Sequence, residues 1–458
     1  RLNITAGDGT EVDCHVPINV YGGLILPESS NVNLDNQTIS ISIVNDGSIA
    51  VNDIQLELIS NSDMVNIDSS SQSIVSLGAN QSTSISFDFT SSAYFAPGAV
   101  LSLPINITSS EGYNRTEFVN ATFGEASRQD PLGPDEYGYL IYDSGDTGYL
   151  MAPEYDWIEI GSSNNLLDLN DTGNGNGSDR TRKLTSLPFP ITFYGVTYNE
   201  MLVSADGWVS FGDHGTSSGN DFIPSFRNYS LPGAGGPSPM VAAFWDDLMT
   251  EYGGGWYGNA TDYGNVYTYE DPGNEYMIVQ WDEMRTCGLV QGYGGDCDGQ
   301  GNGTADQTFQ IIIYNSESIP TITGDNEIKI QYQEFNNTSY GSYPSGGTPS
   351  HGSYATIGIE NHLGNQGLQY TFNNQYADAA MPLSDNKAIV ITTGRASYTP
   401  GDVNQDGNVN ISDIILTVNI ILNIMEPTII EALSADSNSD GILNILDVII
   451  TINIILEL

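Results

Sequence analysis

The sequence is poor in positive charge and in long apolar runs. It has 11 Lys and Arg against 57 Asp and Glu, a formal net charge of −46 over 458 residues. Such an acidic surface repels nucleic acid and anionic lipid, and it attracts divalent cations. No apolar run approaches the roughly 20 residues that a membrane-spanning helix requires. We therefore expect no nucleic-acid partner and no membrane span.

Cysteine is also sparse, with only Cys14, Cys287 and Cys297. Cys287 and Cys297 flank a glycine-rich loop, and an oxidising compartment would favour a disulfide that closes it. Two buried or free thiols are the alternative. Cys14 is then left over, either free or paired with another chain. The chain starts at Arg1, which we interpret as a processed N-terminus.

The patterns of common catalytic centres are missing from the sequence. Its four histidines form neither an HExxH nor an HxH spacing, so a zinc centre is not supported. Neither GxSxG nor a Cys–His signature is found. Asp246 and Asp247 resemble the carboxylate pair of a glycosidase, but neighbours on a strand point to opposite faces. We expect no enzymatic activity, with this pair in a structural turn or in contact with an ion.

Glycine, asparagine and short alternating apolar runs are abundant instead. The 50 Gly and the 10% aromatic content predict a folded, turn-rich, mainly β chain. The pattern N-x-[ST], which marks acceptors of N-glycosylation in secreted proteins, recurs along the chain. The candidate acceptors are Asn3, Asn36, Asn80, Asn106, Asn114, Asn120, Asn170, Asn176, Asn228, Asn259, Asn302, Asn336, Asn337 and Asn410.

The first 136 residues divide into three segments. In residues 1–30, the stretch EVDCHVPINVY alternates as a strand with one buried face, and Pro17 restricts it to an edge or added position. It is either the first strand of the next domain or a strand lent to a neighbouring molecule by β-augmentation. Residues 31–124 contain short alternating runs between turns, which predict a β-sandwich. Residues 125–136 are polar and contain proline, as expected for a linker.

Two parts of the chain resemble known families. The stretches NDGSIAVNDIQLELIS, LGANQSTSISFDF and FAPGAVLSLPINIT resemble the Ig-like modules of secreted bacterial peptidases. Residues 137–396 are similar to nidogen-like extracellular domains, through LPFPITFYGVTYNEMLVSADGWVSFG, SPMVAAFWDDL and the strands from GNVYTYE to ATIGIEN. This second resemblance implies a β-rich module associated with adhesion and matrix assembly. We therefore expect an extracellular or cell-surface location.

Two stretches near the C-terminus repeat at a spacing of 34 residues, GDVNQDGNVNISD and ADSNSDGILNILD. A 12-residue calcium loop takes side-chain oxygens at positions 1, 3 and 5, glycine at 6, a carbonyl at 7 and a carboxylate at 12; position 9 often acts through water. Both copies fit this pattern and predict two Ca²⁺ sites. The expected ligands are Asp402, Asn404, Asp406, the carbonyl of Asn408, Asn410 and Asp413, then Asp436, Asn438, Asp440, the carbonyl of Ile442, Asn444 and Asp447.

Residues 397–458 resemble a type I dockerin, the duplicated loop–helix module that docks onto a cohesin. The stretches after the loops, ISDIILTVNIILNI and ILDVIITINIILEL, predict helices that are apolar nearly all round and need covering on several sides. Cohesin-binding dockerins often carry polar pairs at loop positions 10 and 11, which here are Ile411–Ser412 and Ile445–Leu446. We expect the cover to come from the β-domain of this chain, from another copy, or from a cohesin-like or matrix protein.

A weaker cation site is expected in LLDLNDTGNGNGSD. Its candidate ligands are Asp168, Asn170, Asp171 and Asp179, although Thr172 at position 5 is a poor ligand. A flexible Asn/Gly turn is the alternative reading of this stretch.

The sequence as a whole predicts a non-catalytic modular protein with an Ig-like sandwich, a larger all-β nidogen-like domain and a small all-α dockerin-like module. Its expected function is structural or adhesive, through calcium-stabilised self-association into a surface or extracellular fibre by terminal segments. One alternative is the accessory C-terminal region of a secreted peptidase. The other is a carbohydrate- or matrix-binding module, in which a glycan would stack on Trp208, Trp245, Tyr252, Trp256 and Tyr257.

Overall fold

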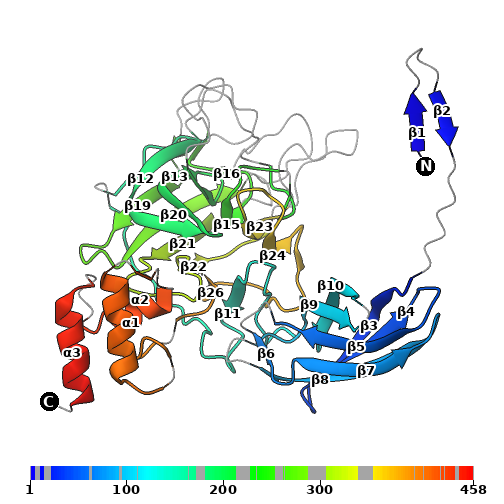
Figure 1. The fold of residues 1–458 in the computed structure, drawn as a ribbon. Helices are drawn as coiled ribbons and strands as arrows, with labels where there is room; N and C mark the ends of the chain where they lie inside the picture. The colour runs from blue at the N-terminus through cyan, green and yellow to red at the C-terminus, as the bar shows by residue number, and fades with distance from the viewer. Residues whose placement is uncertain are drawn as a thin grey trace. The chain divides into compact units, whose positions relative to one another are not determined.

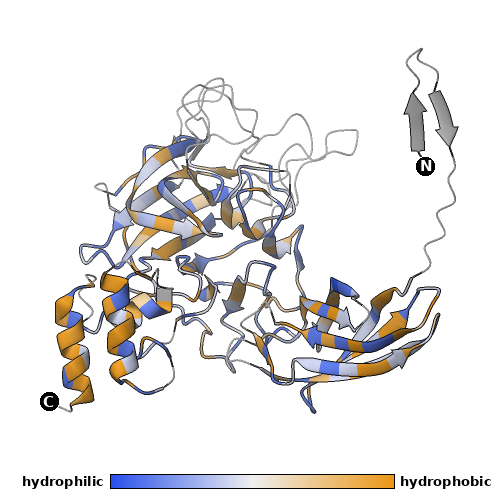
Figure 2. Ribbon diagram, in the orientation of Figure 1, coloured by the Kyte–Doolittle hydropathy of each residue, from blue (hydrophilic) through white to orange (hydrophobic). Residues whose placement is uncertain are grey.

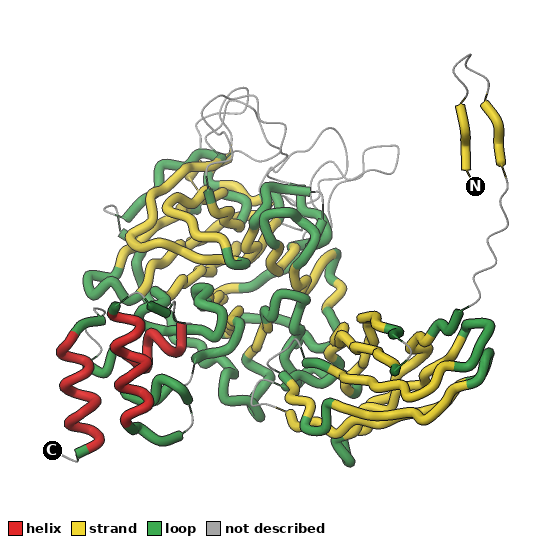
Figure 3. The backbone as a smooth tube through the Cα atoms, viewed as in Figure 1, coloured by secondary structure: helices red, strands yellow, loops and turns green. Residues whose placement is uncertain are grey.

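The structure is a computed structural model of residues 1–458. The chain divides into two compact units, Arg1–Glu125 and Ala126–Leu458. Among the described residues, strands dominate and the helices lie near the C-terminus (Figure 3), so the expected mainly β fold is confirmed. The structure describes the backbone of residues 2–5, 11–14, 251–252 and 261–262, and residues 22–60, 64–91, 95–110, 112–162, 165–171, 181–212, 227–233, 235–250, 264–286, 306–338, 354–396, 398–405, 407–422, 424–425, 427, 429–438 and 443–456 in full.

The first unit contains a β-sandwich of two four-stranded antiparallel sheets (Figure 1), with the strand orders β3-β4-β8-β6 and β10-β9-β5-β7. Alternate side chains of β4 are buried, and the Phe89 and Phe123 rings of the two sheets meet edge-on with centroids 5.3 Å apart. The predicted sandwich is confirmed, and its Ig-like character stays a prediction. The strands are β3 (Ile25–Asn33), β4 (Thr38–Asn45), β5 (Val51–Leu58), β6 (Val65–Ile67), β7 (Ser71–Leu77), β8 (Ser82–Ser91), β9 (Ala99–Ser109) and β10 (Asn114–Phe123).

The sandwich begins earlier than the sequence indicated. Strand β3 starts inside the segment expected to precede the sandwich, because Ile25 is fully buried in the core. The strand expected over residues 11–21 is found in part: β2 (Glu11–Cys14) pairs with β1 (Leu2–Thr5) in an antiparallel hairpin. Residues 15–21 lie outside the described residues.

The second unit contains a β-domain of two seven-stranded antiparallel sheets. The first sheet has the order β11-β26-β22-β21-β20-β16, with β19 also paired to β20, and the second has the order β12-β13-β14-β15-β23-β24-β25. The strands are β11 (Leu140–Asp143), β12 (Arg182–Phe193), β13 (Val196–Ser204), β14 (Trp208–Phe211), β15 (Met240–Trp245), β16 (Leu248–Met249), β19 (Asn265–Glu270), β20 (Tyr276–Thr286), β21 (Asp306–Tyr314), β22 (Ile328–Glu334), β23 (Thr356–Glu360), β24 (Gly367–Phe372), β25 (Gln375–Tyr376) and β26 (Lys387–Thr392), besides the separate pair β17 (Glu251–Tyr252) and β18 (Thr261–Asp262).

The main core of the β-domain lies between these two sheets. The ring of Phe309 on β21 stacks on Phe244 of β15 with centroids 5.7 Å apart, and on Trp281 of β20 with centroids 5.0 Å apart. Trp281 is fully buried, and its Nε1 donates to the Ser204 carbonyl at 2.8 Å. Aromatic side chains of both sheets therefore form one continuous core.

The opposite face of the second sheet is also covered. Trp208 and Trp245 are fully buried there with Leu231, which belongs to the connection between β14 and β15. These two residues cannot form the aromatic platform suggested from the sequence, because strand aromatics are core here. The structure does not describe Trp256, Tyr257 or the side chain of Tyr252.

A row of buried glutamines holds a covering segment on the opposite face of the first sheet. Gln280, Gln310 and Gln331 lie side by side on β20, β21 and β22, with Nε2–Oε1 distances of 3.2 Å between neighbours. Gln310 also donates to the Ile158 carbonyl and Gln331 to the Asp156 carbonyl. Both faces of this sheet are thus packed.

Three helices near the C-terminus follow the repeated loops. Helices α1 (Ile411–Ile421) and α3 (Ile445–Ile455) confirm the two helices expected from the sequence, and α2 (Ile429–Ala435) was not expected. Val403, Ile420 and Ala435 form their small shared core. Among the described residues, no helix is long and apolar enough to cross a membrane.

Candidate metal centre

The first repeated loop folds around the carboxylate of Asp413, the last residue of the predicted calcium loop. Asp413 is fully buried in the first turn of α1. Its Oδ1 accepts the Asn404 N–H at 3.0 Å, and its Oδ2 accepts the Asn410 N–H at 2.9 Å. The Gly407 N–H donates to Asp402 Oδ2 at 2.9 Å. The backbone of the loop therefore fixes the carboxylates at positions 1 and 12.

Local backbone conformation explains the glycine of this loop. Gln405 and Gly407, at positions 4 and 6, have φ values of 56° and 81°, in the left-handed region. No atom would lie within 4 Å of a Cβ at Gly407. Glycine is therefore favoured there by the sharp turn and not by lack of space.

The second loop repeats this arrangement 34 residues later. Asp447 is fully buried, its Oδ1 accepts the Asn438 N–H at 3.4 Å, and its Oδ2 accepts the Asn444 N–H at 2.9 Å. Asp436 and Asn438 occupy positions 1 and 3 of the loop. Asp406, Asp440 and Ile442 are predicted ligands that lie outside the described residues.

Position 9 of each loop has a second role that the sequence analysis missed. The side-chain oxygens of Asn410 and Asn444 cap α1 and α3 by accepting the Ser412 and Leu446 N–H groups at 2.9 and 2.8 Å. An Asn followed three residues later by Asp is the sequence signal of such a capping box. A hydrogen bond to the helix suits position 9, where ligation often goes through water.

A pair of threonines one turn further along also escaped the sequence analysis. Thr417 and Thr451 are fully buried, and each Oγ1 donates to the carbonyl of the loop's last Asp at 2.9 Å. A Cβ at Gly401, before the first loop, would lie 3.5 Å from Thr451 Cγ2, and Gly401 has a φ of 89°. The start of the first loop therefore packs closely on α3. The recurrence of Thr at the 34-residue spacing was the available signal.

The donors of both loops fit a hard divalent cation such as Ca²⁺. They are carboxylate, amide and carbonyl oxygens, and a buried carboxylate charge needs compensation, which a cation supplies. In the part of the chain that the structure describes, no three carboxylate, His or Cys side chains gather as a metal site. Two Asp remain described in each calcium loop, because Asp406 and Asp440 lie outside that part.

The weaker candidate cation site is not gathered in the same way. Asp168 is exposed and Asn170 half-buried, whereas Asp171 is fully buried and its N–H donates to Thr250 Oγ1 at 2.8 Å. Asp179 lies outside the described residues. A cation site here stays a prediction.

The Asp246–Asp247 pair lies in the turn after β15. Both side chains are fully buried. Asp246 Oδ1 accepts the Asp247 N–H at 2.8 Å, and the nearby Asp206 Oδ1 accepts the Leu248 N–H at 3.3 Å. These bonds give the carboxylates a role in fixing the turn between β15 and β16.

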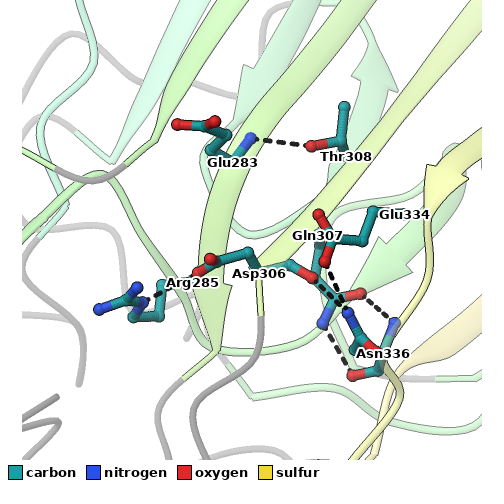
Figure 4. A network of polar contacts seen from close by, with 7 residues as sticks. All are labelled: Glu283, Arg285, Asp306, Gln307, Thr308, Glu334 and Asn336. Carbon is teal, nitrogen blue, oxygen red and sulfur yellow. Dashed lines mark hydrogen bonds and ion pairs between the residues drawn. The ribbon is translucent and has the colours of Figure 1, made fainter.

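A polar network fixes both ends of the loop that contains Cys287 and Cys297 (Figure 4). Arg285 Nε pairs with Asp306 Oδ1 at 2.9 Å across β20 and β21. Asn336 Nδ2 donates to the Asp306 carbonyl, and Gln307 exchanges two hydrogen bonds with the Asn336 backbone. The two cysteines lie outside the described residues, and their disulfide stays a prediction.

Three candidate glycosylation acceptors are engaged inside the fold. Asn228 is 8% exposed and its Nδ2 donates to the Tyr354 carbonyl and Thr356 Oγ1. Asn336 Nδ2 belongs to the network just described, and Asn337 Nδ2 is inaccessible to solvent. Nδ2 is the atom that glycosylation would modify, and in the folded protein it is hydrogen-bonded or inaccessible at these three positions. Glycosylation of the candidate acceptors stays a prediction.

The comparisons with individual known proteins assign no function to this chain. A search of curated proteins finds no match. Among solved structures, an inactive mutant of a GH20 exo-β-N-acetylglucosaminidase from Vibrio harveyi shares 12% identity over 37% of this chain and 23% of its own, with a TM-score of 0.13.

Two family models match the second unit. The model described as Dockerin type I domain matches residues 400–456, so the expected dockerin-like module is confirmed as a domain of the calcium-binding dockerin type. The model described as NIDO related matches residues 154–400, more than half of the chain. Dockerin and NIDO-related domains are both typical of extracellular or cell-surface proteins. The chain therefore belongs to the NIDO-related family.

Proposed function

We propose that this protein is a non-catalytic, extracellular structural or adhesive protein that joins a larger assembly through its terminal segments. Its C-terminal module would bind two Ca²⁺ and present an apolar docking face. The observation that carries the proposal is the exposure of that face in the dockerin-like module.

The docking face consists of two equivalent stripes, one on each long helix. On α1 the stripe is Ile411, Ile415 and Val418 with the C-cap residue Leu422, and on α3 it is Ile445, Ile449 and Ile452 with the C-cap residue Leu456. Both follow the spacing i, i+4, i+7, i+11, which places residues on one side of a helix. Ile411 is 71% and Ile445 63% exposed, and Figure 2 shows the apolar character of both helices.

Exposed aliphatic side chains favour a docked state. Burying one Ile or Leu contributes about 1.5–3 kcal/mol relative to leaving it in water. Apart from the buried Asp413 and Asp447, α1 and α3 contain no charged residue. In a chain with a net charge of −46, these stripes are surfaces that a second acidic molecule can approach without placing charges opposite each other.

Calcium would hold this face in shape. The ion supplies positive charge to the loop oxygens, with Asp402, Asn404, Asp406, Asn408 and Asp413 as ligands in the first loop, and the matching residues of the second loop around the other ion. The first turn of each helix then starts from a fixed loop, because Asp413 and Asp447 belong to both. Metal binding is thereby coupled to helix formation.

The partner that we favour is another copy of this chain. Dockerin domains bind cohesins, and a cohesin-like protein is the alternative partner. The residues at loop positions 10 and 11, Ile411–Ser412 and Ile445–Leu446, are exposed and mostly apolar. They favour a partner with an apolar surface over a cohesin that binds polar residues at these two positions. The peptidase-accessory and glycan-binding alternatives have no comparable structural support.

Sedimentation velocity and electron microscopy of the full chain, with calcium and with EDTA, test the proposal. We expect filaments or large particles in calcium, and their loss in EDTA. The double variant Ile415→Glu/Ile449→Glu should remain monomeric in calcium, because a buried unpaired charge opposes docking.

Leu150→Glu is the matched control for this variant. Leu150 is 97% exposed in the β-domain, so the same change there should leave assembly intact. Assembly of the Ile415→Glu/Ile449→Glu variant at the wild-type rate would refute the docking face.

A further inference from the structure

We infer that strand β7 of the sandwich is the acceptor edge for the N-terminal hairpin of a second copy, with β1 added beside β7. The inference rests on the proposed self-association and names the surface that the N-terminal segment would use.

Four edge strands bound the sandwich, and three of them have features that oppose strand addition. Strand β3 contains Pro27 and Glu28 and a register shift next to them, and β6 is three residues long. Strand β10 carries the Arg115–Glu117 ion pair at 2.8 Å. Proline, charge, bulges and short length are the devices by which proteins prevent their edges from pairing.

Strand β7 has none of these devices. Its sequence is SQSIVSL, without charge or proline. Its pairing with β5 keeps one register from Val51↔Leu77 to Glu57↔Ser71, although Val75 and Asp53, which has a φ of 51°, do not pair. In the described residues, β5 is its only paired strand. Val75, in the middle of β7, is 83% exposed. At the end of the strand, the Leu77 carbonyl accepts Asn45 Nδ2 at 2.9 Å. From Ser71 to Ser76, no strand among the residues that the structure describes pairs with the outer edge.

The hairpin at the N-terminus would be stabilised by pairing with such an edge. β1 and β2 form a two-stranded sheet in the described residues, and such a hairpin is marginally stable alone in water. β1 (Leu2–Thr5) has no charged residue, whereas β2 contains Glu11 and Asp13. An uncharged β1 can lie against the uncharged β7 without placing carboxylates opposite each other, which matters for copies that each carry −46.

Addition of β1 to β7 would join hairpin and sheet into one continuous sheet across two molecules. The backbone hydrogen bonds of the added strand supply affinity, as in other cases of β-augmentation. Four residues of β1 fit within the seven of β7. Because each copy has one hairpin and one acceptor edge, repeated addition is head-to-tail and produces an open chain of molecules.

The test is hydrogen–deuterium exchange of residues 71–77, combined with sedimentation, on the full chain in calcium. We expect the β7 amides to exchange at least tenfold more slowly in the assembled state than in the monomer. Val75→Lys should abolish both assembly and protection, and so should a chain that starts at Gly22, because assembly needs the β7 contact as well as the α1 and α3 stripes. Thermal unfolding of each variant checks that the sandwich still folds.

Val100→Lys is the matched control. Val100 is 59% exposed on β9, which lies between β10 and β5 in the same sheet, so it presents no edge. This variant should assemble and protect β7 as the wild type does.

Three results would overturn the inference, and they differ in what else they refute. If Val75→Lys assembles normally and β7 exchanges equally fast in both states, the acceptor edge is wrong while the proposed self-association stands. If β7 is already protected in the monomer, the occupant is the hairpin of the same chain. If the wild type stays monomeric in calcium, the inference and the proposed self-association both fail.

Discussion

The β-domain and the C-terminal module differ in how far their apolar side chains are buried. In the β-domain, both sheets are packed on two faces, and residues such as Trp245 and Trp281 are fully buried. In the module, the core is small and Ile411, Ile415 and Leu422 of one helix are all more than half exposed. In the described residues of these two regions, only the module leaves a long aliphatic stripe uncovered, so that is where a partner can gain most by docking.

Removal of a core aromatic side chain should give the largest change in the free energy of unfolding. It tests whether apolar side chains are buried in the β-domain and exposed in the module. Trp281→Ala is expected to lower the free energy of unfolding of the β-domain by about 3–5 kcal/mol, because it removes buried area and leaves a cavity. Ile415→Ala in the module should change stability by less than about 0.5 kcal/mol. Denaturant unfolding in calcium compares the two. Similar losses for both variants would mean that Ile415 is covered within the monomer.

Calcium removal should destabilise the C-terminal module and leave the β-domain unaffected. At 100 times its Kd, each ion stabilises the fold that binds it by about 2.7 kcal/mol. EDTA is therefore expected to speed amide exchange in α1 and α3 and to leave β20 and β21 unchanged. Asp168→Ala, at the weaker candidate site, should leave exchange in α1 and α3 as in the wild type. Unchanged exchange in both helices on chelation would contradict the calcium assignment.

One buried carboxyl group, that of Asp146, should make the β-domain more stable at low pH, the opposite of ordinary acid denaturation. Asp146 is fully buried, its Oδ2 accepts the Asp143 N–H at 2.8 Å, and its Oδ1 has no hydrogen-bond partner among the described residues. Burial raises the pKa of Asp146 from 3.8 to about 7. Folding thus favours the protonated carboxyl: its stabilisation is complete below about pH 4 and is lost as pH rises through 7.

Asp146→Asn removes this titration and should flatten the stability profile between pH 5 and 8. We expect a change of about 1–2 kcal/mol across that range, after allowance for solvent screening. Chemical denaturation at fixed calcium measures it. A variant whose profile stays parallel to that of the wild type would show that Asp146 titrates at the value of an exposed aspartate.

The smallest expected effect concerns the helix caps of the module. Asn410→Ala should destabilise α1 by about 1 kcal/mol in calcium, since the Ser412 N–H loses its acceptor. Asn410→Asp keeps an acceptor and should retain the wild-type stability. Equal destabilisation by both substitutions would contradict the capping role of Asn410.

Local patterns explain what the sequence could predict. The calcium loops and the helices after them depend on residues within 12 positions of each other, so Asp402 and Asp413 can be assigned without a structure. Some strands of the β-domain follow from alternation, whereas β11, β14, β15 and β23 are buried along their whole length and do not alternate. The same local reasoning found the sandwich but placed its start too late, because the burial of Ile25 depends on distant strands.

Other features depend on contacts that are distant in sequence. The order of the two seven-stranded sheets, which places Gln280 beside Gln310 and Gln331, has no local signal. The burial of Trp208 and Trp245 requires a covering connection. Helix α2 has seven residues, too few for a clear helical period, and its Ser434 carbonyl accepts the Gly401 N–H at 2.7 Å from the first loop.

Hydroxyl-radical footprinting of the aliphatic stripes tests the central claim most directly. The full chain is oxidised as monomer and as assembly, both in calcium, and oxidation of the α1 and α3 side chains is compared with that of Leu150 by mass spectrometry. We predict that assembly lowers oxidation of Ile415 and Ile449 several-fold and leaves Leu150 unchanged. Equal oxidation of both stripes in monomer and assembly would contradict the account.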